Sequence, residues 1–274
     1  MRYIDKNFLK ENYEFFLFDI FGVIHDGVNA YPGSIDFVNT LTTNKKVIFL
    51  SNVPRPSSLS YEHLKNLGIE REFTVITSGD LAQNLLKTKF WNKKVFHWGE
   101  KQNPEITKNI NLISANTIED ADLILLTYHA EEGSDLSEQE EIIVKICELQ
   151  KPVMCANPDE EAIFNGKKRL CSGYFARKIL NKGGTVTQLG KPFPKIYQFL
   201  ELKNKELKAK KYKALMIGDT LETDIAGAFQ YGLDTLLILS GITGEKLKKN
   251  NLSLDEYINK NKLEYRPNYI MQSF

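Results

Sequence analysis

The amino-acid sequence predicts an α/β fold in which helices cover both faces of a parallel sheet. Short, wholly apolar segments recur along the chain, and residues 15–18 are the clearest of them. Segments with a helical spacing of apolar residues separate these runs in regular alternation. Strands that are apolar throughout, each followed by a helix, are typical of parallel sheets that are buried on both faces.

The first third of the chain alternates three strands with three helices. The predicted strands lie at residues 15–18, 47–50 and 74–77. Pro32 and Gly33 introduce a helix in which the apolar residues from Ile35 to Leu41 follow a helical period. A second helix contains Leu59, Leu64 and Leu67 and ends at Gly68, and a third lies at 79–89.

The remaining two thirds continue the alternation. The predicted strands lie at residues 95–98, 123–127, 153–155, 185–189, 214–217 and 235–239. The predicted helices lie at residues 136–149, 172–181, 195–202 and 224–231. The run from Ser137 to Glu140 has the spacing of a capping box, so we expect it to begin the first of these helices.

Composition places few limits on the function but excludes some partners. The chain has 274 residues, 42% of them hydrophobic and 26% charged, which suits one large globular domain or two smaller ones. Thirty-six basic residues balance 35 acidic ones, so the net charge gives no reason to expect binding to nucleic acid or to a membrane surface. Lysines at 203–213 and 246–249 are expected on solvated surfaces.

The cysteines and the start of the chain favour a reducing, cytoplasmic location. Cys147, Cys155 and Cys171 are odd in number and fit no zinc or redox motif, so we expect buried thiols. Residues 1–6 lack the apolar run of a signal peptide. No apolar segment approaches the ~18 residues that a membrane helix needs.

Polar residues follow four of the predicted strands. Asp19 follows the first strand, Ser51-Asn52 the second, Gly190-Lys191-Pro192 the strand at 185–189, and Gly218-Asp219 the strand at 214–217. The carboxyl ends of the strands in an open parallel sheet gather at one crevice, so we expect these residues to meet there. Each one alone has an ordinary alternative as a turn former, helix-start acid, surface lysine or strand-end hydroxyl. The whole set in this order favours a site.

These residue types suit an anion together with a hard cation. Asp19 can attack phosphorus or bind a metal, and Asp219 can offer Mg²⁺ a second carboxylate oxygen. Asp224, near the start of the next helix, can complete the coordination shell. Lys191 can pair with a phosphate oxygen, and Ser51 with the nearby backbone N–H groups can hold the others.

In these four sites the chain resembles the haloacid dehalogenase-like superfamily of Mg²⁺-dependent phosphatases. More narrowly it is similar to subfamily IIA, which includes NagD-like proteins, nitrophenylphosphatases and pyridoxal phosphatases. The residues that carry this resemblance are Gly22-Val23, Pro32-Gly33, Ser51-Asn52, Gly190-Lys191-Pro192 and the run 218–225. Residues 156–159, Ala-Asn-Pro-Asp, are similar to the cap motif of that subfamily.

The resemblance implies a Rossmann-like core with an inserted α/β cap. It places the core at residues 1–78 and 183–274 and the cap at 79–182. It makes Asp19 the nucleophile that forms an aspartyl-phosphate on a small phosphorylated metabolite. The residues that it assigns to Mg²⁺ are Asp19, the backbone carbonyl of Phe21, Asp219 and Asp224. The residues that it assigns to the substrate are Ser51, Asn52, Asn157 and Lys191, with Ser51 and Lys191 also assisting catalysis. The oligomeric state stays open, with a homodimer through the cap as one arrangement.

Phe21 departs from the family pattern. Most of these phosphatases have a second Asp at this position, which protonates the leaving oxygen and then deprotonates the attacking water. Such help is typically worth about 10²–10⁴-fold in rate, so we expect alkyl phosphates to react slowly. In one interpretation, His25 or Asp26 replaces the missing acid, although His25 is more simply a loop residue and Asp26-Gly27 a turn. In the other, no group replaces it and turnover is weak.

The sequence therefore leaves two main hypotheses. The first is a Mg²⁺-dependent phosphatase acting through Asp19. The second is a catalytically impaired protein that uses the same pocket to bind a phosphorylated ligand, as a binding or regulatory protein. A response-regulator receiver would also contain a phospho-accepting Asp and a Lys, but this chain is too long for one, and the motif at 218–224 has no place in it.

Overall fold

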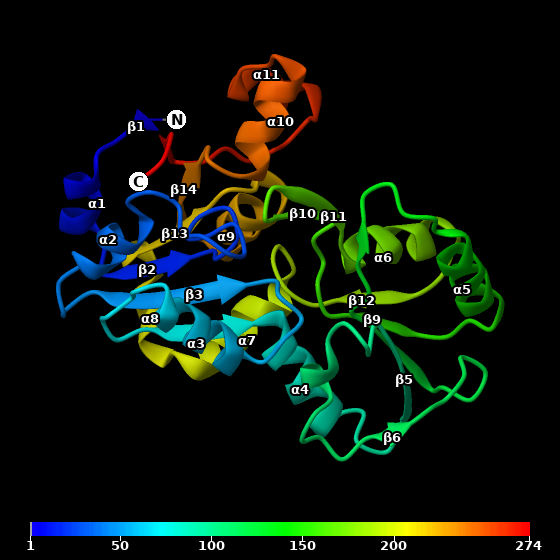
Figure 1. The fold of residues 1–274 in the computed structure, drawn as a ribbon. Coiled ribbons are helices and arrows are strands. Elements are labelled where there is room, and N and C mark those ends of the chain that lie inside the picture. The colour runs from blue at the N-terminus through cyan, green and yellow to red at the C-terminus, as the bar shows by residue number, and fades with distance from the viewer. Residues whose placement is uncertain (1) are drawn as a thin grey trace. The chain divides into compact units, whose positions relative to one another are not determined.

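The computed structural model describes residues 2–274, and these residues form two compact units. The first unit contains residues up to Ser51, together with Tyr61–Ile76 and Tyr197–Phe274. The second contains Asn52–Ser60 and Thr77–Ile196. The second unit thus takes in the predicted insertion at 79–182 and also a short segment that follows Ser51 (Figure 1).

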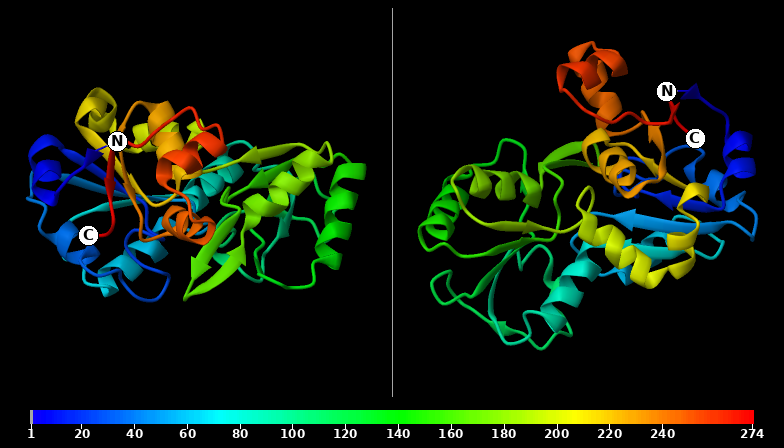
Figure 2. Two further views of the ribbon diagram at one scale, coloured as in Figure 1. Left: turned by 90° about the horizontal axis from the view of Figure 1, so that it is seen from above. Right: turned by 180° about the vertical axis from the view of Figure 1, so that it is seen from behind.

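A seven-stranded sheet organises the described part of the first unit. Its order is β1-β15-β14-β13-β2-β3-β4, and neighbours such as β13 and β2, or β2 and β3, run parallel. The strands are β1 Arg2–Tyr3, β2 Phe15–Phe18, β3 Lys46–Ser51, β4 Thr74–Thr77, β13 Ala214–Gly218, β14 Asp234–Ile238 and β15 Tyr269–Met271. Because β1 pairs with β15, the blue start and the red end of the ribbon meet at one edge of the sheet (Figure 1, Figure 2).

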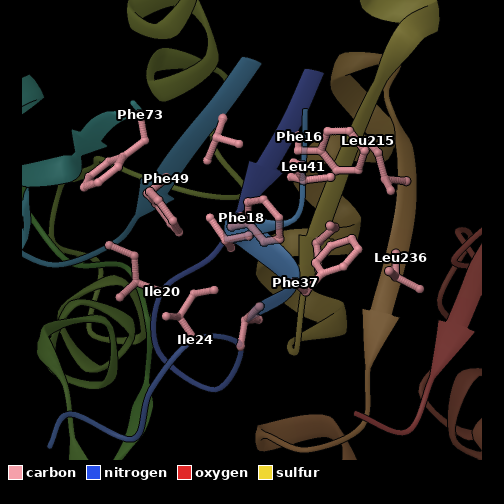
Figure 3. Close-up of a cluster of buried hydrophobic side chains, with 14 of the residues drawn as sticks. Phe16, Phe18, Ile20, Ile24, Phe37, Leu41, Phe49, Phe73, Leu215 and Leu236 are labelled. Carbon is pink, nitrogen blue, oxygen red and sulfur yellow. The ribbon is translucent and has the colours of Figure 1, made fainter. Parts of the chain in front are cut away.

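Strand β2 lies between β13 and β3 and is buried, as its apolar sequence predicts. All four of its residues are buried, and Phe16 pairs with Val47 of β3 and Leu215 of β13. The rings of Phe16 and Phe18 lie 6.3 and 6.1 Å from that of Phe37 in a T-shaped geometry (Figure 3). Strand β2 has no polar side chain, and this is favourable because both of its faces are buried.

Helices follow the strands of the first unit, mostly where the sequence predicts them. The helical segments with residues in this unit are α1 Lys6–Asn12, α2 Ser34–Asn39, α3 Ser57–Asn66, α7 Pro194–Lys203, α8 Lys205–Ala209, η2 Lys211–Lys213, η3 Leu221–Ile225, α9 Ala226–Tyr231, α10 Ile242–Asn250 and α11 Leu254–Lys260. The helix expected at 224–231 begins earlier, as the π-helical turn η3, and continues as α9. A second apolar cluster joins η3, α10 and α11 to β14, with Leu221, Leu247, Ile258 and Leu237 among its members.

The second unit contains its own parallel sheet. The five strands described there are ordered β12-β9-β7-β5-β6, with β5 Lys94–Trp98, β6 Ile113–Ser114, β7 Leu123–Leu126, β9 Val153–Cys155 and β12 Val186–Gln188. A smaller antiparallel sheet is ordered β10-β11-β8, from β8 Ala130–Glu131, β10 Glu161–Phe164 and β11 Lys167–Leu170. The helical segments are α4 Ser78–Thr88, η1 Pro104–Ile106, α5 Ser137–Glu148 and α6 Ser172–Asn181. Trp98, Ile124, Ile143 and Phe175 belong to its core.

Two expectations from the sequence are wrong. The strand expected at 185–189 does not join the sheet of Asp19, because β12 pairs with β9, with Val186 opposite Val153. The capping box expected at Ser137 does not form either. The N-cap of α5 is Leu136, which makes no side-chain cap, and Asp135 Oδ1 accepts the Ser137 N–H at 2.9 Å instead.

The expectation of buried thiols is met by two of the three cysteines and not by the third. Cys155 and Cys171 are buried free thiols, and Cys147 is partly exposed. Burial raises the pKa of Cys155 to about 12, as expected of an inert thiol. Among residues 2–274, none of the helices combines the length and the apolar character that a membrane crossing requires.

Candidate active site

Three carboxylates meet at the carboxyl edge of the seven-stranded sheet. Asp19 follows β2, Asp219 follows β13, and Asp224 lies in η3. One oxygen from each lies within 4.8 Å of the others. The first two converge because β2 and β13 are parallel neighbours, and the Asp19 N–H donates to Ile217 O at 2.8 Å. The structure therefore brings these three of the predicted site residues together.

Asp224 shapes the loop that carries Asp219. Its Oδ2 accepts the backbone N–H groups of Asp219 and Thr220, each at 3.1 Å. The side chain is almost fully buried, with 1% of its residue surface exposed. A carboxylate that accepts two backbone N–H groups fixes the turn after β13, so Asp224 orients Asp219 whatever else it binds.

Asp219 is held by the start of α10. The Ile242 N–H donates to Asp219 Oδ2 at 2.6 Å, and the Thr220 hydroxyl donates to Oδ1 at 3.2 Å. Thr243, on the same turn, accepts the Leu221 N–H at 3.1 Å. Free N–H groups at a helix start can donate to such an oxygen, so the first turn of α10 fixes the position of the Asp219 carboxylate.

Glycines allow the backbone to approach these carboxylates closely. A Cβ built at Gly22 would lie 2.3 Å from Asp219 Oδ2, and one at Gly241 would lie 2.0 Å from the same atom. Gly22 also has a φ of +82°, a conformation that other residues rarely adopt. A Cβ at Gly218 would lie 2.2 Å from the Cβ of Asp224. The site therefore depends on the absence of side chains at three positions.

The donor set fits a hard divalent cation. Three buried carboxylates repel one another at this range unless a cation or a shared proton offsets their charge. Mg²⁺ prefers carboxylate oxygen, bound through a small number of side chains. The pKa of Tyr31 is raised to about 12, mainly by burial and then by the negative charges of Asp219 and Asp26.

Position 21 is filled by an aromatic ring packed on histidine. The ring of Phe21 lies edge-on to that of His25, 4.7 Å between centroids, and His25 packs in turn on His63 at 4.8 Å. His25 is 2% exposed, and its Nδ1 accepts the Gly27 N–H at 2.9 Å. The imidazole thus organises the loop after β2.

Asp26 is a turn former, the simpler of the two readings of its sequence. Its Oδ1 accepts the N–H groups of Val28 and Asn29 at 2.9 and 2.7 Å. These bonds hold the pKa of the Asp26 carboxyl below its usual range. A carboxyl that is stabilised as its anion is a poor proton donor, so Asp26 is not well suited to replace the acid missing at position 21.

Ser51 and Asn52 follow β3 but belong to different units. Ser51 ends β3 in the first unit and is 2% exposed. In the second unit, Asn52 Oδ1 accepts the Lys191 N–H at 2.7 Å and its Nδ2 donates to Lys191 O at 2.9 Å. Asn52 Nδ2 also donates to Asp159 Oδ1 at 2.8 Å. The Asn52 amide therefore fixes the backbone of Lys191, which is 1% exposed.

Asn157 belongs to the same network of the second unit. Its Oδ1 accepts the Asp159 N–H at 3.0 Å, which forms the turn between β9 and β10. Gly190 allows the contact between Asn52 and Lys191, because a Cβ there would lie 2.5 Å from Asn52 Oδ1. The structure thus brings Asn52, Asn157 and Lys191 into one network and Asp19, Asp219 and Asp224 into another.

Sequence reasoning missed two groups of supporting residues. One is the turn Gly241-Ile242-Thr243, which follows β14 and holds Asp219. Its position after a predicted strand was an available signal. The other is Ser78, fully buried, whose Oγ lies 2.7 Å from Asn52 O and 2.5 Å from Ala156 O. Nothing in the local sequence distinguishes Ser78 from an ordinary helix-start serine.

Comparison with protein families gives a consistent result for both ends of the chain. A family model described as haloacid dehalogenase-like hydrolase matches residues 16–113. A second model, described as HAD-hydrolase-like, matches residues 188–274. The two matched segments contain all but the first residue of β2, with Asp19, and the whole of β13, with Asp219. These strands build the carboxylate cluster.

Similar proteins include named phosphatases. The chain is 24% identical over 232 residues to the sugar-phosphatase AraL of Bacillus subtilis, covering 82% of each chain. It is 28% identical over 265 residues to a 4-nitrophenylphosphatase of Schizosaccharomyces pombe, covering 86% of this chain and 87% of the other. A crystal structure of a haloacid dehalogenase-like hydrolase from Brucella suis has the same fold, with a TM-score of 0.82, 23% identity and 98% of each chain covered.

Proposed function

Because the chain belongs to the haloacid dehalogenase-like hydrolases, we propose that it is a Mg²⁺-dependent phosphatase of a small phosphorylated metabolite, with Asp19 as nucleophile. The observation that carries this proposal is the cluster of Asp19, Asp219 and Asp224 at the end of neighbouring strands. The sugar-phosphatase and the 4-nitrophenylphosphatase among its relatives support the reaction class, a phosphoric-monoester hydrolysis.

The proposed reaction has two displacements at phosphorus. In the first, an Asp19 carboxylate oxygen bonds to phosphorus and the bond to the leaving oxygen breaks, which leaves an aspartyl-phosphate. In the second, a water oxygen bonds to the same phosphorus and the bond from phosphorus to the Asp19 oxygen breaks. This frees the carboxylate and releases inorganic phosphate, which keeps the protons of the water or passes one to solvent. Each step moves charge onto oxygen, so the groups around phosphorus must stabilise anions.

The chain's own residues divide the remaining tasks in this proposal. Asp19, Asp219, Asp224 and the backbone carbonyl of Phe21 would hold Mg²⁺, which when bound offsets the charge of the phosphoryl oxygens. For Lys191 and Ser51 we propose phosphate binding, by resemblance to the family motifs. Asn52 positions the Lys191 backbone through its two hydrogen bonds. We further propose that residues 79–182 form the inserted cap, with Asn157 at the substrate.

The missing acid at position 21 should make the enzyme selective for its leaving group. An aryl or acyl phosphate releases a stable anion and needs little protonation, whereas an alkyl phosphate needs a proton on its leaving oxygen. Phe21, packed on His25, supplies none. We therefore propose efficient turnover on activated phosphates and slow turnover on alkyl phosphates.

Phe21 also favours a second candidate function. A protein that binds a phosphorylated ligand without turnover needs the anion site but not the proton donor. In that case the same carboxylates and lysine would form a regulatory binding site. The two candidates differ in whether Asp19 is required for any hydrolysis.

The test compares Mg²⁺-dependent hydrolysis of an aryl phosphate, an acyl phosphate and a sugar phosphate by the wild type and by Asp19→Asn. The matched control is Asp36→Asn, the same change at an exposed carboxylate on α2. We expect turnover of the activated substrates by the wild type and the control, and its loss in Asp19→Asn. Equal inactivity of the wild type and Asp19→Asn on all three substrates would favour the binding protein.

A further inference from the structure

The second unit contains a cavity that the proposed reaction does not use. Its volume is about 310 Å³, at the lower end of the range of small-molecule pockets. It lies beside the small antiparallel sheet. The polar side chains that line it are Gln102, Tyr128, His129, Glu131, Ser134 and Arg169. A pocket of this size lined by so many polar groups suits a small polar ligand rather than an apolar one.

Arg169 is the charged group of this pocket with an unused donor. Its guanidinium lies over the ring of Phe164, 4.2 Å from the centroid, which holds its plane in place. The Nε atom is buried, and within residues 2–274 it has no hydrogen-bond acceptor. A buried charged donor without a partner is costly, so an acceptor that enters the pocket would be bound favourably.

A second arginine adds to the positive potential at the pocket. The pKa of His129 is lowered, first by burial and then by the charges of Arg169 and Arg55. Both guanidinium groups therefore act on one imidazole of the pocket wall. Glu131 opposes them, since it pairs in register with Arg169, but it is exposed and its charge is screened by solvent.

Gln102 makes this wall rigid. Its Nε2 donates to His129 O at 2.7 Å, and its Oε1 accepts the His129 N–H at 3.0 Å. Tyr128 is fixed from behind by Trp98, whose ring stacks on it at 5.8 Å between centroids. A pocket whose walls are already ordered loses little conformational entropy when a ligand binds.

We infer that this pocket binds an anionic group of a small metabolite, a carboxylate or a phosphate, with Arg169 as its main contact. The planar guanidinium matches either anion in a two-bond geometry. Ser134 offers a hydroxyl at the same wall. This site requires neither Mg²⁺ nor Asp19, so it stands independently of the proposed phosphatase activity.

The test measures binding of malonate and of inorganic phosphate to the full-length protein by calorimetry, without Mg²⁺. Arg169→Met removes the charge but keeps an unbranched side chain that can pack on Phe164. Lys168→Met is the matched control, because it removes a positive charge from the residue that precedes Arg169 in β11. Lys168 does not line the pocket and forms an ion pair with Glu161. The chain contains two tryptophans, so Trp91→Phe leaves Trp98 as a fluorescent reporter beside the pocket.

We expect saturable binding that Arg169→Met weakens roughly 10- to 100-fold, the usual effect of losing hydrogen bonds to a charged group. Lys168→Met should bind as the wild type does, and Arg169→Lys should be intermediate. Binding of malonate alone or of phosphate alone identifies which anion the pocket takes. Equal affinity in the wild type and Arg169→Met, or no binding of either anion across the millimolar range, would overturn the inference.

Discussion

At position 21 an aromatic side chain replaces an acid, and its neighbours suit the aromatic ring. Phe21 packs on His25, and His25 on His63, so a row of rings lies directly after the proposed nucleophile. Sequence reasoning found this departure without a structure, because it needs only the residue identity. It could not show that His25, on which the ring packs, lies against His63, since His63 is 42 residues away from Phe21 in the chain.

Phe21→Asp should therefore raise the turnover of alkyl phosphates. A carboxyl group at this position can protonate the leaving oxygen, which is typically worth about 10²–10⁴-fold, whereas aryl phosphates should change little. The measurement is kcat/KM for a sugar phosphate relative to that for an aryl phosphate. Phe21→Leu is the control, because it removes the ring without adding an acid. A rise of the same size in Phe21→Leu would contradict this explanation, provided that circular dichroism shows both variants folded.

Gly22→Ala should lower the free energy of unfolding, for two reasons that a second glycine can separate. Alanine there should cost about 1–2 kcal/mol through its left-handed backbone and a further ~1–3 kcal/mol through overlap with Asp219. Gly232→Ala is a close match, since Gly232 has a φ of +84° in the same unit but nothing within 4 Å of its added Cβ. Urea unfolding measures both costs. Equal free energies of unfolding for the two variants would show that contact with Asp219 does not matter.

At the scale of elements, buried strands were predictable and exposed ones were not. Strand β2 is apolar at every position, and so its sequence alone indicates its burial. Strands β10 and β11 contain charged residues and no clear alternation, because they form a partly exposed hairpin. Helix caps were also hard to predict. Ser137 matches the capping-box motif, but it is the first residue of α5 and not its N-cap. Local spacing does not distinguish an N-cap from the first helical residue.

Strand β5 contains a histidine that should make the second unit sensitive to acid. His97 Nε2 lies 2.8 Å from Thr127 Oγ1, and within the described residues its buried Nδ1 has no hydrogen-bond partner. Burial lowers the pKa of His97 from 6.5 to about 4. Between these values the unfolded chain binds a proton that the folded chain does not, so stability falls as the pH falls through this window.

His97→Gln tests this sensitivity, because glutamine can still bond Thr127 but does not titrate. The wild type should lose about 3 kcal/mol of unfolding free energy through His97 as the pH falls from 6.5 towards 4, and the variant should not. Urea unfolding at pH 7 and at acid pH, followed by the fluorescence of Trp98 on the same strand, gives the difference. A parallel loss in both proteins would mean that other groups account for the acid sensitivity.

At the scale of the whole molecule, the order of the motifs was predictable but the pairing of their strands was not. Asp19 and Asp219 come together because β2 and β13 are neighbours, although 200 residues separate them in the chain. Lys191 follows a strand of the other sheet, since β12 pairs with β9. Pairing depends on which distant surfaces bury each other, and an apolar run of three to five residues does not specify its partner.

Mg²⁺ should stabilise the first unit in a manner that depends on Asp219. A ligand that binds only the folded state stabilises it by RT ln(1 + [L]/Kd), about 2.7 kcal/mol at 100 times Kd. Hydrogen exchange followed by mass spectrometry resolves the effect by segment. Peptides from β2 and β13 should exchange more slowly with Mg²⁺, and peptides from β7 and β9 of the second unit should not change. Asp219→Asn should abolish this protection, because it removes a carboxylate from the cluster while keeping an oxygen that can accept the Ile242 N–H. Protection that survives in Asp219→Asn, or that is equal in all peptides, would place the cation elsewhere in the molecule.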